Sequence, residues 1–206
     1  MAGQASTWQL TRTKTTAHCV CSDAQKARAR FKGVRILMKI NQPTYLIAEL
    51  AGDVVPLVAD SRSRFNPGRV SWPIDITIVG SSGAGTIKEG QCLLKTIDLL
   101  APIIEKYFFN KVKFISVSRF PNTGIFYLEP ERELFDLLHN EVVNSDILFN
   151  SNEWPYNPHC TLCASDELTD KDVKAFSELP IPSKVSIDCF SLYQPTVNGG
   201  SRVHQF

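Results

Sequence analysis

Two stretches of the chain share one pattern, Trp72-Pro-Ile-Asp-Ile-Thr-Ile-Val-Gly80 and Asn157-Pro-His-Cys-Thr-Leu162. In each, a titratable side chain is followed two positions later by a threonine, which gives the pairs Asp75/Thr77 and His159/Thr161. Side chains alternate between the two faces of a strand, so each pair points to one side of its sheet. Because helix-forming sequence follows each stretch, the repeat predicts two related lobes.

The residue types in these pairs suit chemistry on a phosphate group. An imidazole gains or loses its proton near pH 7, and a neighbouring hydroxyl can donate a hydrogen bond to a phosphoryl oxygen. Two such pairs on facing strands would flank a single phosphate. One titratable group could then deprotonate the attacking oxygen while the other protonates the leaving oxygen, without a metal ion.

With these two motifs the sequence resembles the 2H phosphoesterase superfamily, the group of 2′-5′ RNA ligases and cyclic phosphodiesterases. The resemblance runs from about Tyr45 to Phe206 and includes the Trp72-Pro73 lead-in and Gly124-Ile-Phe-Tyr-Leu128 between the motifs. It implies a bilobal α+β fold, with two pseudo-symmetric antiparallel sheets and outer helices around a central cleft.

The resemblance also implies an activity, hydrolysis of 2′,3′-cyclic phosphates or 2′-5′ linked nucleotides, with neither metal nor cofactor. By it, His159 is a catalytic histidine, and Thr77 and Thr161 are the phosphate-binding hydroxyls. The expected partner is a nucleotide or an RNA-end phosphate, not a membrane, and the expected state is a monomer.

The first motif departs from the family pattern, because Asp75 stands where the family has a histidine. A carboxyl group has an unperturbed pKa of about 3.9, against about 6.5 for histidine, and its negative charge repels a phosphodiester. Asp75 could act as a weak general base, or burial could raise its pKa until it serves as an acid. The alternative is a nucleotide- or RNA-binding pseudoenzyme of the same fold.

Composition places the chain among ordinary globular proteins. It has 206 residues, 43% hydrophobic, with a formal net charge of +1. No apolar run approaches the ~18–20 residues of a membrane span. The charge is uneven: residues 1–39 carry a net +7 and the remainder −6. We interpret residues 1–33 as a basic N-terminal extension and residues 34–206 as the phosphoesterase-like domain.

The N-terminal extension bears on localisation. It has no apolar core typical of a secretory signal, and the six cysteines of the chain then indicate reduced thiols in the cytoplasm. Mitochondrial targeting by the basic, Ser/Thr-rich extension is the alternative.

Hydrophobic periodicity and turn residues predict the elements along the chain. Ser22 and Thr169 are expected to begin helices with capping boxes. Residues 80–85 are expected to form a flexible loop at the cleft mouth, and Pro102 to kink its helix. The expected strands are residues 34–40, 44–50, 74–79, 113–119, 125–128, 160–163, 185–193 and 202–206, the helices 53–60, 91–109, 131–145 and 169–179, and the loop 62–70.

Several other residues invite functional interpretations that we do not favour. His139 is expected at a helix boundary or on the surface. The pairs Cys19/Cys21 and Cys160/Cys163 each lie beside a histidine, but short motifs of this kind often occur by chance. Cys160 and Cys163 on one strand would also point to opposite faces, unlike the ligands of a zinc site. Arg119 and Tyr127, on the expected central hairpin, could contact a phosphate or a base, or belong to the surface or the core.

Overall fold

A computed structural model describes residues 38–196 and 199–206, all of which belong to one compact unit. The expected extension of residues 1–33 and its capping box at Ser22 lie outside the described residues. A strand was predicted at residues 34–40, of which the structure describes residues 38–40. These three residues form only an isolated bridge, between Lys39 and Cys92, so the predicted strand is wrong for them.

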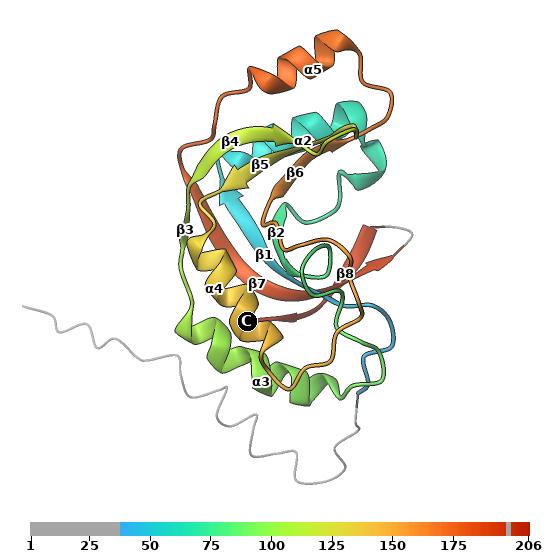
Figure 1. The fold of residues 1–206 in the computed structure, drawn as a ribbon, viewed down its shortest axis with the longest axis vertical. Coiled ribbons are helices and arrows are strands. Elements are labelled where there is room, and N and C mark those ends of the chain that lie inside the picture. Colours follow the sequence, from blue (N-terminus) through green and yellow to red (C-terminus); the bar gives the residue numbers. More distant parts are fainter. Residues whose placement is uncertain (1–37, 197–198) are drawn as a thin grey trace, which may run out of the picture. The chain divides into compact units, whose positions relative to one another are not determined.

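Two antiparallel sheets form the framework (Figure 1). The larger has the order β2-β1-β7-β3, with β8 paired to β7, and the smaller has the order β4-β5-β6. This arrangement confirms the expected α+β class with two antiparallel sheets. The strands are β1 (Tyr45–Gly52), β2 (Asp75–Val79), β3 (Lys111–Val112), β4 (Phe114–Arg119), β5 (Ile125–Pro130), β6 (Cys160–Ala164), β7 (Val185–Thr196) and β8 (Gly199–Gln205).

Four α-helices are described with these sheets: α2 (Val54–Phe65), α3 (Leu93–Lys106), α4 (Glu133–Val143) and α5 (Asp170–Ser177). The capping box that begins α5 is confirmed, because Thr169 and Asp172 exchange hydrogen bonds between side chain and backbone. Helix α2 continues to Phe65 and is followed by a 3₁₀ turn at Pro67–Arg69, so the loop expected at residues 62–70 is wrong. In α4, the side chain of Leu138 is buried, whereas that of Leu134 is exposed.

Alternation along the strands separates a core face from a cleft face. In β2, Ile76 and Ile78 are fully buried in the hydrophobic core, whereas Asp75 and Thr77, which alternate with them, line a cleft. Strands β2 and β6 come from different sheets and contact each other. The cleft residues of the two sheets are therefore brought together at this junction.

In the described part of the chain, we find no helix both long enough and apolar enough to cross a bilayer.

Candidate active site

All four residues predicted for the site line one cleft of about 410 Å³. Strand β2 contributes Asp75 and Thr77, and β6 contributes Thr161, with His159 immediately before it. The structure thus brings the two motifs together, although they lie far apart in sequence. The volume is within the range of about 300–1,000 Å³ that is usual for small-molecule sites.

The imidazole of His159 is held in one orientation. Its Nδ1 donates to the carbonyl of Asn157 at 2.8 Å. Two aromatic rings from β5 and the preceding turn pack edge-on against it, Tyr127 at 5.3 Å and Phe120 at 5.1 Å between ring centroids. Burial among these groups lowers the pKa of His159 below its ordinary value. A neutral ring with its proton on Nδ1 carries a free lone pair on Nε2, which is the form of a general base.

The environment of Asp75 raises the pKa of its carboxyl group, whereas that of His159 lowers the pKa of its imidazole. Burial raises the pKa of its carboxyl group to about 6. The Arg62 guanidinium and a hydrogen bond from the Thr77 hydroxyl, at 3.2 Å, lower it and offset part of this effect. The carboxyl group therefore titrates close to the range of a histidine, so it can carry a proton at mildly acidic pH.

Arg62 is a residue of the cleft that our sequence interpretation missed. Its side chain is buried, and Nη1 donates to the carbonyls of Trp72 at 2.8 Å and Pro73 at 3.0 Å. Val54, Val58 and Arg62 recur every four residues and share the buried face of α2. This spacing is the signal in the sequence that points to Arg62, although the polar residues 62–70 favour a loop.

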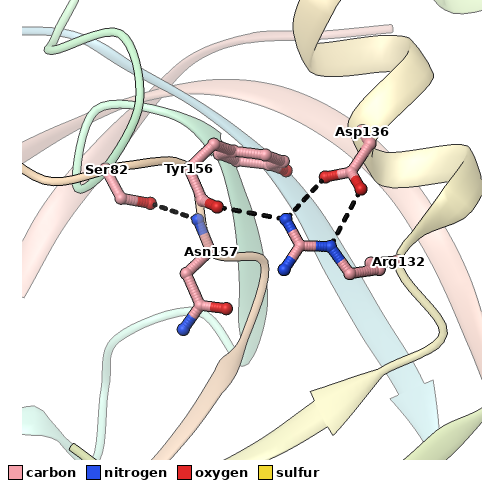
Figure 2. Close-up of polar contacts among 5 residues, drawn as sticks. All are labelled: Ser82, Arg132, Asp136, Tyr156 and Asn157. Carbon is pink, nitrogen blue, oxygen red and sulfur yellow. Dashed lines mark hydrogen bonds and ion pairs between the residues drawn. The ribbon is translucent and has the colours of Figure 1, made fainter.

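The segment that leads to His159 is fixed by hydrogen bonds from two sides (Figure 2). On one side, Arg132 pairs with Asp136 at 2.9 Å and also donates to the carbonyl of Tyr156 at 3.2 Å. On the other side, the backbone N–H of Asn157 donates to Ser82 Oγ at 3.1 Å. Both contacts restrain the Tyr156–Asn157 peptide, which directly precedes the peptide whose carbonyl accepts from the imidazole. They therefore help to hold that imidazole in place.

His139 is buried, which contradicts the expected boundary or surface position. Its Nδ1 donates to the carbonyl of Ile78 at 2.7 Å. Its ring stacks on that of Tyr156, with the two ring centroids 3.8 Å apart. The Tyr156 hydroxyl in turn donates to the carbonyl of Thr77 at 3.3 Å. This stack joins the strand of the first motif to the segment before the second, so His139 has a structural role.

The loop at residues 80–85 is tied down by hydrogen bonds. Gly83 donates to the carbonyl of Trp154 at 2.8 Å and Gly85 to that of Asn150 at 3.1 Å. Gly83 has a φ of 68° and lies against His139, where an added Cβ would come within 2.5 Å of the ring. The loop borders the cleft through Ser81, as expected, and it packs on the segment that precedes His159.

The other sequence candidates among the described residues lie outside the cleft lining. Arg119 is exposed and donates to the carbonyl of Thr123, while Tyr127 is buried against His159. Cys160 and Cys163 are both buried, and burial raises their thiol pKa values to about 12 and about 11. Cys19 and Cys21 lie outside the described residues. Within the described ranges, no group of three or more His, Cys, Asp or Glu could hold a metal ion.

The raised pKa of the Asp75 carboxyl group predicts that the free energy of unfolding depends on pH. Because the folded pKa of Asp75, about 6, exceeds the ordinary 3.8, the folded protein binds this proton more tightly than the unfolded chain does. The stabilisation is complete below pH 3.8 and is lost as pH rises through about 6. We expect Asp75→Asn to be more stable than wild type at pH 7.5, by at most about 3 kcal/mol, and the difference to fall to about 0.5 kcal/mol near pH 4.

Urea unfolding of both proteins at the two pH values measures this difference. Asp98→Asn, at an exposed carboxylate outside the cleft, is the matched control. An Asp75→Asn variant that is less stable than wild type at pH 7.5 would contradict the expected cost of burying the charge.

Comparisons with known proteins find solved structures whose backbones are distantly similar to that of this chain. No family model matches the sequence, and no curated protein matches it. Among solved structures, Escherichia coli LigT complexed with 3′-AMP is 15% identical, with a TM-score of 0.47 over 80% of this chain and 97% of LigT. A structure described as a phosphoesterase is 15% identical, with a TM-score of 0.48 over 81% and 97% of the two chains. Values this low carry no conclusion about chemistry.

Proposed function

We propose that the chain is a metal-independent phosphodiesterase of the 2H type, acting on 2′,3′-cyclic phosphates or 2′-5′ linked nucleotides and RNA ends. One observation carries the proposal: Asp75, Thr77, His159 and Thr161 line the same cleft. The pKa directions support it, because burial lowers the pKa of His159 and raises that of Asp75, which suits one group to accept a proton and the other to donate one.

For a 2′,3′-cyclic phosphate, the proposed reaction is a displacement at phosphorus. Nε2 of His159 takes a proton from water as the water oxygen forms its bond to phosphorus. The bond from phosphorus to one ribose oxygen breaks, and the protonated carboxyl group of Asp75 donates to that oxygen. The hydroxyls of Thr77 and Thr161 donate to the non-bridging oxygens, which carry negative charge in the transition state; the Thr77 hydroxyl turns to them from Asp75 once that carboxyl group is protonated. Proton transfer from His159 back to Asp75, through solvent, restores the starting state.

Charge in the cleft is compatible with an anionic substrate. The carboxylate of Asp75 alone would repel a phosphodiester. Arg62 also lines the cleft and is close enough to Asp75 to lower the pKa of that carboxyl group. Its positive charge offsets the negative charge that Asp75 adds to the cleft.

Direct turnover tests the proposal. We expect the protein to convert nucleoside 2′,3′-cyclic phosphates, or 2′-5′ linked dinucleotides, to products in the presence of EDTA at pH 6. Chromatography of the nucleotides measures the conversion. A preparation of His159→Ala, purified in parallel, separates this activity from a contaminating nuclease. Equal turnover by the two preparations, or none by wild type between pH 5 and 8, would contradict the proposal.

Asp75 also motivates the second candidate, a nucleotide- or RNA-binding pseudoenzyme. A carboxyl group with a pKa of about 6 is mostly ionised at pH 7 and is then unable to donate a proton. Asp75→His distinguishes the two candidates. If wild type binds a nucleotide without turning it over and Asp75→His creates turnover, the native chain is a binding protein; turnover by wild type excludes that candidate.

A further inference from the structure

The turn that precedes β2 is organised by a single buried side chain. Besides its bonds to the carbonyls of Trp72 and Pro73, Arg62 Nη1 donates to the carbonyl of Arg69 at 3.3 Å. The Arg69 N–H donates to the carbonyl of Asn66 at 2.8 Å. Helix α2 therefore holds this turn by its backbone, which frees the side chains of Arg69 and Trp72 to face the cleft that they both line.

Among the residues that the structure describes, no carboxylate pairs with the guanidinium of Arg69. It lies over the indole ring of Trp72, 5.0 Å from the ring centroid. Arg69 is exposed, and within residues 38–196 and 199–206 it forms no ion pair. Stacking on an aromatic ring leaves the in-plane N–H donors of a guanidinium available, and their planar fork matches the oxygens of a phosphate.

The indole of Trp72 is already covered, which argues for an anion rather than a nucleobase at this position. Arg69 lies over the ring, and Tyr193 packs against it with centroids 6.3 Å apart and planes inclined by 54°. A base stacking on the face of Trp72 that Arg69 covers would have to displace the guanidinium. A phosphate, in contrast, can bind the guanidinium without any rearrangement.

We propose that Arg69, stacked on Trp72, forms a second phosphate subsite that recognises the 5′-phosphoryl group of the nucleotide whose 2′,3′-phosphate is bound by Thr77 and Thr161. This inference rests on the proposed function. Arg69 lines the same cleft of about 410 Å³ as Thr77 and Thr161, a volume usual for a single small molecule, so we assign the second phosphate to the same nucleotide. The preferred substrate class is then 5′-phosphorylated nucleotides or RNA ends.

Calorimetric titration with two ligands that differ by one phosphate tests the subsite. Adenosine 2′-monophosphate probes the first subsite alone, and adenosine 2′,5′-bisphosphate probes both. We expect wild type to bind the bisphosphate at least about tenfold more tightly, which corresponds to ~1.4 kcal/mol. Arg69→Gln should reduce this ratio to near one while leaving the Kd of the monophosphate within about twofold. Arg69→Lys, which keeps the charge but loses the planar fork, should give an intermediate ratio.

Arg64→Gln is the matched control, because Arg64 is also exposed and stacked on an aromatic ring, Phe65, but lies outside the cleft. It should retain the wild-type ratio. A ratio near one in wild type, or a tenfold ratio that persists in Arg69→Gln, would overturn the subsite even if the monophosphate binds. Failure of both ligands to bind wild type would overturn this inference and the proposed function together.

A third ligand identifies the source of the 5′ phosphate. An adenylyl dinucleotide ending in a 2′-phosphate carries a 5′ phosphodiester with one negative charge at the same position. Affinity equal to that of the bisphosphate would assign the subsite to RNA ends. Affinity nearer that of the monophosphate would assign it to free 5′-phosphorylated nucleotides.

Discussion

Asp75→Asn is expected to lower kcat for 2′,3′-cyclic phosphate hydrolysis at pH 6 by about 10²–10⁴-fold, the usual contribution of one general acid. The amide keeps an oxygen that can accept the Thr77 hydrogen bond, but it has no proton to give to the leaving oxygen. Steady-state kinetics of both proteins measure the loss. We expect KM to change much less than kcat, because the proton is transferred in the transition state.

The pH profile separates this role from a purely structural one. In wild type, kcat/KM should fall about tenfold per pH unit above pH 6, because the carboxyl group with a pKa of about 6 loses the proton that it must donate. Asp75→Asn should retain little activity and show no such decline between pH 6 and 8. Asp98→Asn should keep the wild-type profile. A wild-type rate that rises between pH 6 and 8 would exclude Asp75 as the general acid.

His159→Ala is expected to lower kcat/KM by a similar factor, about 10²–10⁴, because water loses the base that accepts its proton. Wild-type activity should also decline on the acid side, at a pH below the ordinary histidine pKa, since burial lowers the pKa of His159. That decline should be absent in His159→Ala. The measurement is kcat/KM from pH 4.5 to 8.

Two controls bear on the His159 prediction. His204→Ala removes a half-buried imidazole outside the cleft, and it should retain wild-type kinetics. Added imidazole should restore part of the activity of His159→Ala by entering the space that the side chain leaves between Phe120 and Tyr127. Unchanged kcat/KM in His159→Ala would remove His159 from the mechanism and, with it, the proposed function.

Much of the fold could be predicted because periodicity is local information. Strand β2 and strand β6 were recognised from alternating apolar residues, and the cap of α5 from Thr169 and Asp172. The sequence-based predictions were wrong where tertiary contacts decide the local structure. The polar residues near Arg62 suggested a loop, yet helix α2 continues because Arg62 is buried against carbonyls of a following turn. His139 was likewise misplaced, since its partner Tyr156 is remote in sequence.

By itself, the sequence determined which side chains share a face. The period of two along a strand commits Asp75 to the side of Thr77, and His159 to that of Thr161. Only the tertiary structure decided what these groups can do. The proton affinity of Asp75 depends on burial and on its distance from Arg62, and the lone pair of His159 depends on the carbonyl of Asn157. Desolvation and Coulomb interaction act through space, so the order of residues along the chain does not specify them.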